Sequence, residues 1–132
     1  MKITPDTNVF VRVVVGDDAA QSSSALAALE NADLVAVTTS MLCEAVWVLS
    51  RGYRLPLKEI ADTIRTFIAS SAVESNRPAI EAGLAAMYVG GDFADGVIAF
   101  EGASLGGDTF ASFDKEAVSL LKKQGREALL LK

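Results

Sequence analysis

Four aspartates stand at positions where acidic side chains could take part in chemistry: Asp6, Asp92, Asp95 and Asp114. Asp6 and Asp114 each follow directly on a short run that favours a strand, whereas Asp92 and Asp95 open an apolar segment together. Taken singly, each is explained equally well as a helix N-cap, because Asp accepts hydrogen bonds from the free N–H groups of a first helical turn. Taken together, they are candidate acid–base groups or oxygen ligands of a hard divalent cation.

Glu44 is the acid whose surroundings are most unusual. Residues 41–49 read MLCEAVWVL, and a helix over this segment is apolar nearly all round. A buried carboxylate without a partner costs several kcal/mol or is driven to its neutral form. We therefore expect Glu44 to serve a site, unless it faces a narrow polar stripe or pairs with a buried arginine.

The elements that must position these acids alternate between short apolar runs and amphipathic segments. The pattern predicts strands ending near residue 6 and at 34–37, 72–75, 109–112 and 128–131. It predicts helices at 7–15, 19–31, from a cap at Thr39 or Ser40 to residue 50, and at 57–70, 77–89, 92–105 and 115–123. Because strands separated by helices pair in parallel, we expect a three-layer α/β/α sandwich with a central, mostly parallel sheet. At 132 residues, the chain is expected to be a single domain spanning residues 1–132.

The fold rule predicts that the acids meet at one edge of the sheet, since ligands of such sheets bind outside the carboxyl ends of the strands. Carboxylates gathered there repel one another unless a cation neutralises them. We predict Mg²⁺ or Mn²⁺, because both ions prefer carboxylate and water oxygens. A cation held in this way lowers the pKa of a bound water and supports hydrolysis of a phosphodiester. The predicted catalytic and metal-binding residues are Asp6, Glu44, Asp95 and Asp114, with Asp92 as a further metal ligand.

Polar and basic residues near the acids are candidate contacts for a phosphate. Hydrogen bonds to the ligands or to a phosphate are expected from Thr7, Asn8 and Ser112. A basic rim for RNA is expected from Arg12, Arg51 and Lys115, with Arg54 beside them, although each is also an ordinary solvated charge. The chain has 12 Lys and Arg against 17 Asp and Glu, a net charge of −5, whereas nucleic-acid binders are typically basic. Neutralisation of the site acids by a cation removes part of this deficit.

Absent residue types exclude several other kinds of site. The chain contains no histidine, which excludes Ser-His-Asp and Cys-His catalysis and histidine-bound zinc. The single cysteine, Cys43, excludes an intramolecular disulfide. No apolar run reaches the roughly 18 residues of a membrane span, and the first residues lack a signal-peptide pattern. We expect a soluble cytoplasmic protein that does not contact a membrane.

The motifs DTN at 6–8, DFAD at 92–95 and TFASFD at 109–114, with Glu44 in an apolar helix, resemble the PIN domain. The most similar group is the VapC-type toxins of bacterial toxin–antitoxin pairs, and the resemblance extends from Ile3 to about Leu131. It implies a Mg²⁺- or Mn²⁺-dependent endoribonuclease with an α/β/α sandwich, whose acid quartet maps onto Asp6, Glu44, Asp95 and Asp114. It also implies a homodimer and a VapB-type antitoxin whose C-terminal segment lies across an apolar groove beside the acids, lined by the early helices.

Two residues depart from the family's pattern. Gly96 follows the third acid where a larger residue is common, and we expect it to loosen the start of that helix. Asp108 is expected to add a negative charge near the site.

Two other functions compete with the nuclease. An aspartyl-phosphate enzyme of the haloacid dehalogenase kind would use Asp6, but it requires a second Asp where this chain has Asn8. A degenerate nuclease retained as a binding module is the second. The intact acids argue against it, because an unused cluster of like charges destabilises a fold.

Overall fold

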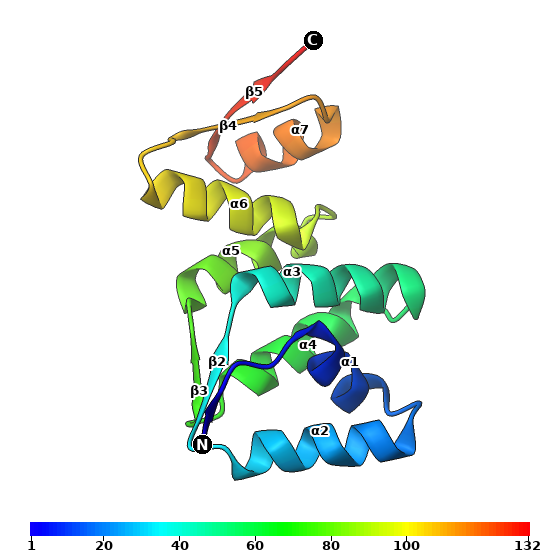
Figure 1. The fold of residues 1–132 in the computed structure, drawn as a ribbon. Coiled ribbons are helices and arrows are strands. Elements are labelled where there is room, and N and C mark those ends of the chain that lie inside the picture. The colour runs from blue at the N-terminus through cyan, green and yellow to red at the C-terminus, as the bar shows by residue number, and fades with distance from the viewer. The chain divides into compact units, whose positions relative to one another are not determined.

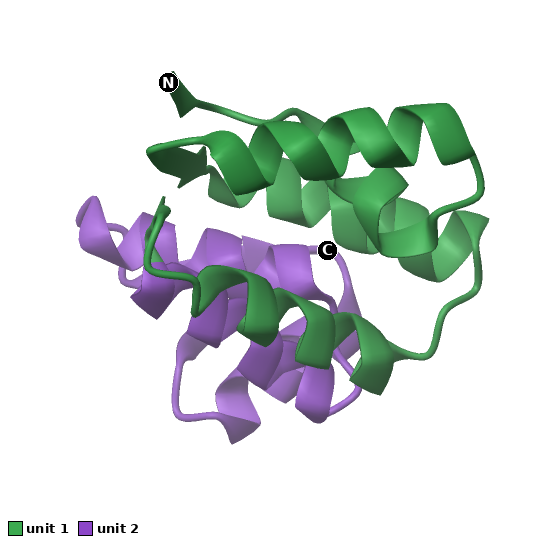
Figure 2. Ribbon diagram, turned by 90° about the horizontal axis from the view of Figure 1, so that it is seen from below, with its two compact units in different colours: residues 1–76 green, residues 77–132 purple.

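The computed structural model describes residues 1–132, which form two compact units, residues 1–76 and residues 77–132 (Figure 2). Both units contain parallel strands with helices around them, so the predicted α/β fold class is confirmed. None of the helices combines the length and the apolar character needed to cross a membrane.

The first unit is built on a three-stranded parallel sheet of order β1-β2-β3, formed by Lys2–Ile3, Leu34–Val37 and Val73–Ser75 (Figure 1). Val35 at the centre of the sheet aligns with Ile3 on one side and Val73 on the other. Four α-helices belong to this unit: α1 (Thr7–Val15), α2 (Ala19–Asn31), α3 (Thr39–Trp47) and α4 (Leu57–Ile68). A π-helix, η1 (Val48–Gly52), continues α3.

The core of the first unit is formed by one apolar side of each of three helices against the sheet. The fully buried side chains include Phe10 of α1, Leu42 of α3, and Ile60 and Ile64 of α4. Burying each such side chain contributes about 1.5–3 kcal/mol, so this packing holds the three helices against the sheet. The aromatic rings of Phe10 and Phe67 meet with centroids 5.0 Å apart.

The second unit contains a parallel pair of strands and three helices. Its elements are α5 (Arg77–Tyr88), α6 (Phe93–Ser104), β4 (Thr109–Ser112), α7 (Lys115–Lys123) and β5 (Glu127–Leu130). Helices α5 and α6 pack along each other, and their buried side chains include Ile80, Leu84, Phe93 and Val97. Because β4 and β5 are parallel, their carboxyl ends lie on the same side of this unit. Helix α7 directly follows the carboxyl end of β4.

The predicted segments agree closely with these elements, and α1, α2, β2, β4 and α7 have the predicted bounds. The cap of α3 differs, because Thr38, not Thr39 or Ser40, accepts the hydrogen bond from the N–H of Met41, at 3.1 Å. Three consecutive hydroxyl residues offer equivalent caps in the sequence. Only the chain direction at the end of β2 selects among them.

Candidate metal and phosphate site

Asp6 is held at the start of α1 by a capping hydrogen bond. Its backbone is extended, and its Oδ1 accepts from the N–H of Val9 at 3.1 Å. Its Oδ2 takes part in no hydrogen bond, and the residue is exposed. Thr7 and Asn8 follow in the first turn, half-buried and exposed respectively. Capping therefore leaves one carboxylate oxygen of Asp6 available to a ligand.

Glu44 lies on an exposed stripe of α3, so the expectation that it is buried was wrong. Ser40, Glu44, Trp47 and Arg51 are exposed along one side, while the opposite side of the helix is buried. In the sequence, residues 41–49 look apolar all round because Trp47 is a large apolar residue that is nevertheless exposed, on the same stripe as Glu44. The alternative of an exposed stripe therefore describes where Glu44 lies, and its role as a ligand stays a prediction. Exposure removes burial as an argument for function, but it leaves the carboxylate open to a cation.

Three acids of the second unit lie at the starts of α6 and α7. Asp92 caps α6, with its Oδ1 accepting from the N–H of Ala94 at 3.1 Å. Asp114 caps α7, and its Oδ1 accepts from Glu116 and Ala117 at 2.9 and 3.2 Å. Asp95 lies in the first turn of α6 and is half-buried.

Asp95 is the electrostatic centre of this group. Burial raises the pKa of its carboxyl above the ordinary value, and the negative charges of Asp92 and Asp114 raise it further. Asp92 and Asp114 thus lie near enough to Asp95 for their charges to disfavour its ionised form. A cation beside Asp95 would remove this repulsion.

Ser112, predicted to assist the site, fixes the strand-to-helix turn that presents Asp114. Its Oγ accepts from the N–H of Asp114 at 3.0 Å, and its carbonyl oxygen accepts from the N–H of Leu131 at 2.8 Å. Asp108 was expected to add a negative charge near the site, but it lies away from Asp114. It precedes β4 whereas Asp114 follows that strand, so the two residues lie at opposite ends of it.

The donor chemistry of these residues fits a hard divalent cation. Asp6, Asp92 and Asp114 each accept their capping hydrogen bonds through Oδ1, and their Oδ2 atoms accept none. Carboxylate oxygens are the ligands that Mg²⁺ and Mn²⁺ prefer. No three acidic or cysteine side chains converge into a complete metal-binding group, however. As they stand, the three acids of the second unit therefore do not form a metal-binding group by themselves.

Arg12 is engaged in a network that sequence reasoning missed. Its guanidinium donates to Gln21 Oε1 at 2.6 Å and to the hydroxyl of Tyr53 at 3.3 Å, and it pairs with Asp17 at 3.5 Å. Tyr53 in turn donates to Asp17 at 3.0 Å. These bonds tie α1 to the start of α2 and to the residue after η1. Its predicted contact with RNA would compete with this network.

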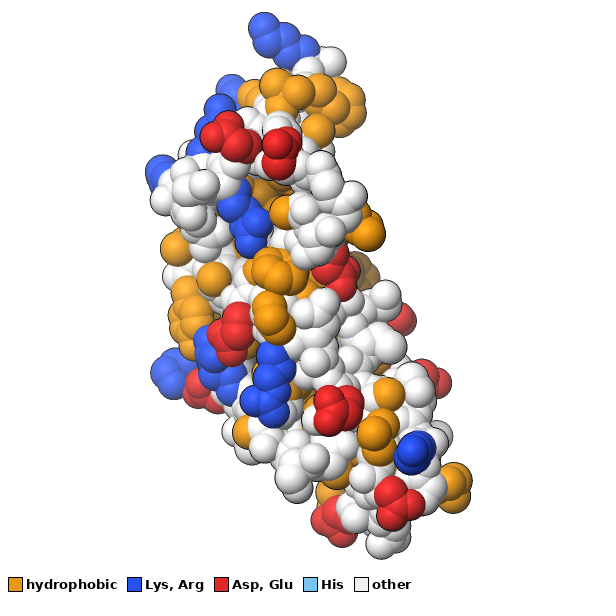
Figure 3. All heavy atoms as spheres, turned by 90° about the vertical axis from the view of Figure 1, so that its left-hand side faces the viewer, with side chains coloured by type: hydrophobic (Ala, Val, Ile, Leu, Met, Phe, Trp, Pro, Cys, Tyr) orange, Lys and Arg blue, Asp and Glu red, His pale blue; other side chains and the backbone are white.

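The other predicted basic residues, Arg51 and Lys115, are exposed, as is Arg54. Lys115 is the first residue of α7 and directly follows Asp114. On the face shown in Figure 3, basic side chains lie among acidic and hydrophobic ones.

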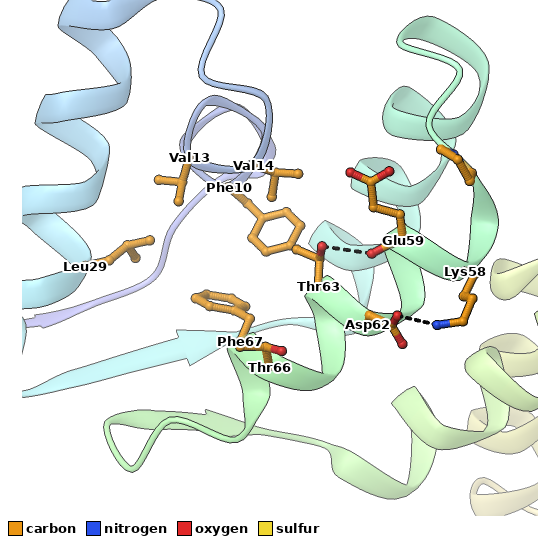
Figure 4. Close-up of a pocket in the computed structure, with 11 residues that line it drawn as sticks. Phe10, Val13, Val14, Leu29, Lys58, Glu59, Asp62, Thr63, Thr66 and Phe67 are labelled. Carbon is orange, nitrogen blue, oxygen red and sulfur yellow. Dashed lines mark hydrogen bonds and ion pairs between the residues drawn. The ribbon is translucent and has the colours of Figure 1, made fainter.

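The first unit contains an apolar groove lined in part by the early helices. It has a volume of about 660 Å³ and lies between α1, α2 and α4 (Figure 4). Its apolar lining is formed by Phe10, Val13, Val14, Leu29 and Phe67. Its rim carries Glu59 and the ion pair of Lys58 with Asp62 at 2.9 Å. The contribution of α4 was not foreseen, because it depends on packing between distant segments.

The fold is parallel α/β, and Asp6 and Asp114 cap helices that directly follow strands, which is where folds of this kind commonly bind ions or phosphates. The sequence pattern of the PIN domain matches residues 3–123, so this chain belongs to the PIN domain family. PIN domains are generally nucleases that act on nucleic acids with divalent metal ions. No curated protein matches the chain.

Proposed function

We propose that this protein is a Mg²⁺- or Mn²⁺-dependent endoribonuclease of the VapC type. In this proposal residues 1–132 act as one domain, and the cation is held by Asp6, Glu44, Asp95 and Asp114, with Asp92 assisting. The observation that carries the proposal is the group of carboxylates around half-buried Asp95 in a chain of the PIN family.

The chain's own residues would bind and orient the scissile phosphate. Three of the acids are pre-positioned by capping bonds, so few side-chain rotamers must be fixed when a ligand arrives. Lys115 and the N–H groups at the start of α1 suit phosphate oxygens. A bound divalent cation would polarise the phosphoryl oxygen and lower the pKa of the attacking water.

The groove between α1, α2 and α4 supports the regulatory part of the proposal. Its apolar floor and charged rim suit an amphipathic segment of a VapB-type antitoxin. We further propose a homodimer that acts on RNA in the cytoplasm as the toxin of a type II toxin–antitoxin system.

The decisive experiment is cleavage of cellular RNA by the partner-free protein with Mn²⁺, with Mg²⁺ and with EDTA. We expect discrete fragments with metal, none with EDTA, and a loss of at least about 100-fold in rate for Asp6→Asn and Asp95→Asn. Asp108→Asn is the matched control, because it removes a charge from the other end of β4. Full activity in Asp95→Asn would contradict the proposal.

A binding module without catalysis is the second candidate. It is favoured by the absence of three acids that converge into a complete metal-binding group. Absence of both cleavage and Mn²⁺ binding in the wild-type protein would favour it over the nuclease.

A further inference from the structure

Gly96 allows the backbones of α5 and α6 to touch. A Cβ atom at position 96 would lie 2.4 Å from the carbonyl oxygen of Ala82 and 2.9 Å from the Cβ of Ala86. Both distances are too short for real contacts, and the nearest atom is backbone, which cannot rotate away. The expectation that Gly96 loosens the start of its helix was therefore wrong, because the missing side chain permits closer packing.

The ring of Phe93 packs directly against the backbone of α5 at Gly83, where no side chain stands in its way. A Cβ atom at position 83 would lie 2.6 Å from two ring carbons of Phe93 and 2.9 Å from Cγ2 of Val97. The Phe93 side chain is 1% exposed, so the ring has no solvent-exposed position in this packing. The ring thus attaches the first residue of α6 to α5.

These two contacts flank the acids of the site. Phe93 directly follows Asp92, and Gly96 directly follows Asp95. The N–H of Gly96 also donates to the carbonyl oxygen of Asp92 at 3.2 Å. The helical turn that carries both carboxylates is therefore pressed onto α5 at both of its ends.

We propose that Gly83 and Gly96 are positioning residues of the metal site, which fix the first turn of α6 and with it the carboxylates of Asp92 and Asp95. This inference rests on the proposed function. A side chain at either position displaces that turn from α5 and moves both ligands together.

The test compares Gly96→Ala with Gly102→Ala in the full-length protein. Gly102 lies in the same helix, and its added Cβ would meet only the carbonyl oxygen of Gly107, at 3.9 Å. We expect Gly96→Ala to weaken Mn²⁺ binding by about 10- to 100-fold in calorimetry, as loss of a group that orients metal ligands does. In the metal-free protein, amide hydrogen exchange at residues 93–97 should also accelerate. Gly102→Ala should change neither quantity.

Gly83→Ala is the second variant, and it decides the matter if Gly96→Ala does not fold, because its added Cβ atom would meet side chains rather than backbone. It should weaken Mn²⁺ binding in the same way, and adding Phe93→Leu should restore binding by removing the clashing ring atoms. A folded variant of either glycine with lower thermal stability but wild-type Mn²⁺ affinity would overturn this inference and leave the metal assignment unaffected. Absence of Mn²⁺ binding to the wild-type protein would overturn the metal assignment and this inference together.

Discussion

Asp95 combines partial burial with two negative neighbours, and both effects disfavour its charged form. Its carboxyl therefore has a higher pKa in the folded chain than in the unfolded chain. A raised folded pKa contributes stability below the unfolded pKa, and this contribution is lost as the pH rises through the folded pKa. At neutral pH without metal, the ionised Asp95 consequently destabilises the fold.

At the residue scale, we predict that Asp95→Asn stabilises the metal-free protein while it abolishes Mn²⁺ binding. The melting temperature of the variant should exceed that of the wild type at pH 7. The difference should shrink toward pH 3, below the ordinary Asp pKa of about 3.9, where both side chains are neutral. Thermal unfolding from pH 3 to 8 measures this, and a variant less stable than wild type at pH 7 would contradict the assigned environment.

At the element scale, helix caps and ligand positions coincide. Asp6, Asp92 and Asp114 are the N-caps of α1, α6 and α7, so the ordinary explanation of each aspartate holds. The proposed ligand role remains open to all three, because capping occupies one oxygen of the two. Capping also aligns these side chains with the N-termini of their helices, where negative charge is favoured.

Two substitutions of Asp114 separate these roles. Asp114→Ala removes both capping bonds and should lower the free energy of unfolding by about 1 kcal/mol, whereas Asp114→Asn keeps an acceptor and should change it little. Both should lose Mn²⁺ affinity, since neither has a carboxylate. Denaturant unfolding and calorimetry measure the two effects. Equal stability of the two variants would show that the capping bonds contribute nothing to α7.

At the scale of the whole molecule, the proposed ligands are distributed along the chain. Asp6 and Glu44 belong to residues 1–76, whereas Asp92, Asp95 and Asp114 belong to residues 77–132. A ligand that binds only the folded state stabilises it, by about 2.7 kcal/mol at a hundred times its Kd. Comparing how much Mn²⁺ stabilises the wild-type protein and variants of single acids therefore shows which acids bind the same ion.

We predict that Mn²⁺ raises the melting temperature of the wild-type protein and that Asp6→Asn and Asp95→Asn each remove this rise. Asp108→Asn should retain it. If Asp95→Asn removed the rise while Asp6→Asn kept all of it, the ion would be held by the acids of residues 77–132 without Asp6. Differential scanning calorimetry with and without EDTA distinguishes these outcomes.

Local sequence patterns predict the order and approximate bounds of the elements, the capping aspartates and the family. These features depend on the period of apolar residues and on hydrogen bonds between residues close in the chain, so they are readable locally. Tertiary structure alone decided the exposure of Glu44, the engagement of Arg12 with Tyr53, and the contact of Gly96 with α5. Each depends on which distant segment covers a helix or meets a side chain, and no local pattern carries that information.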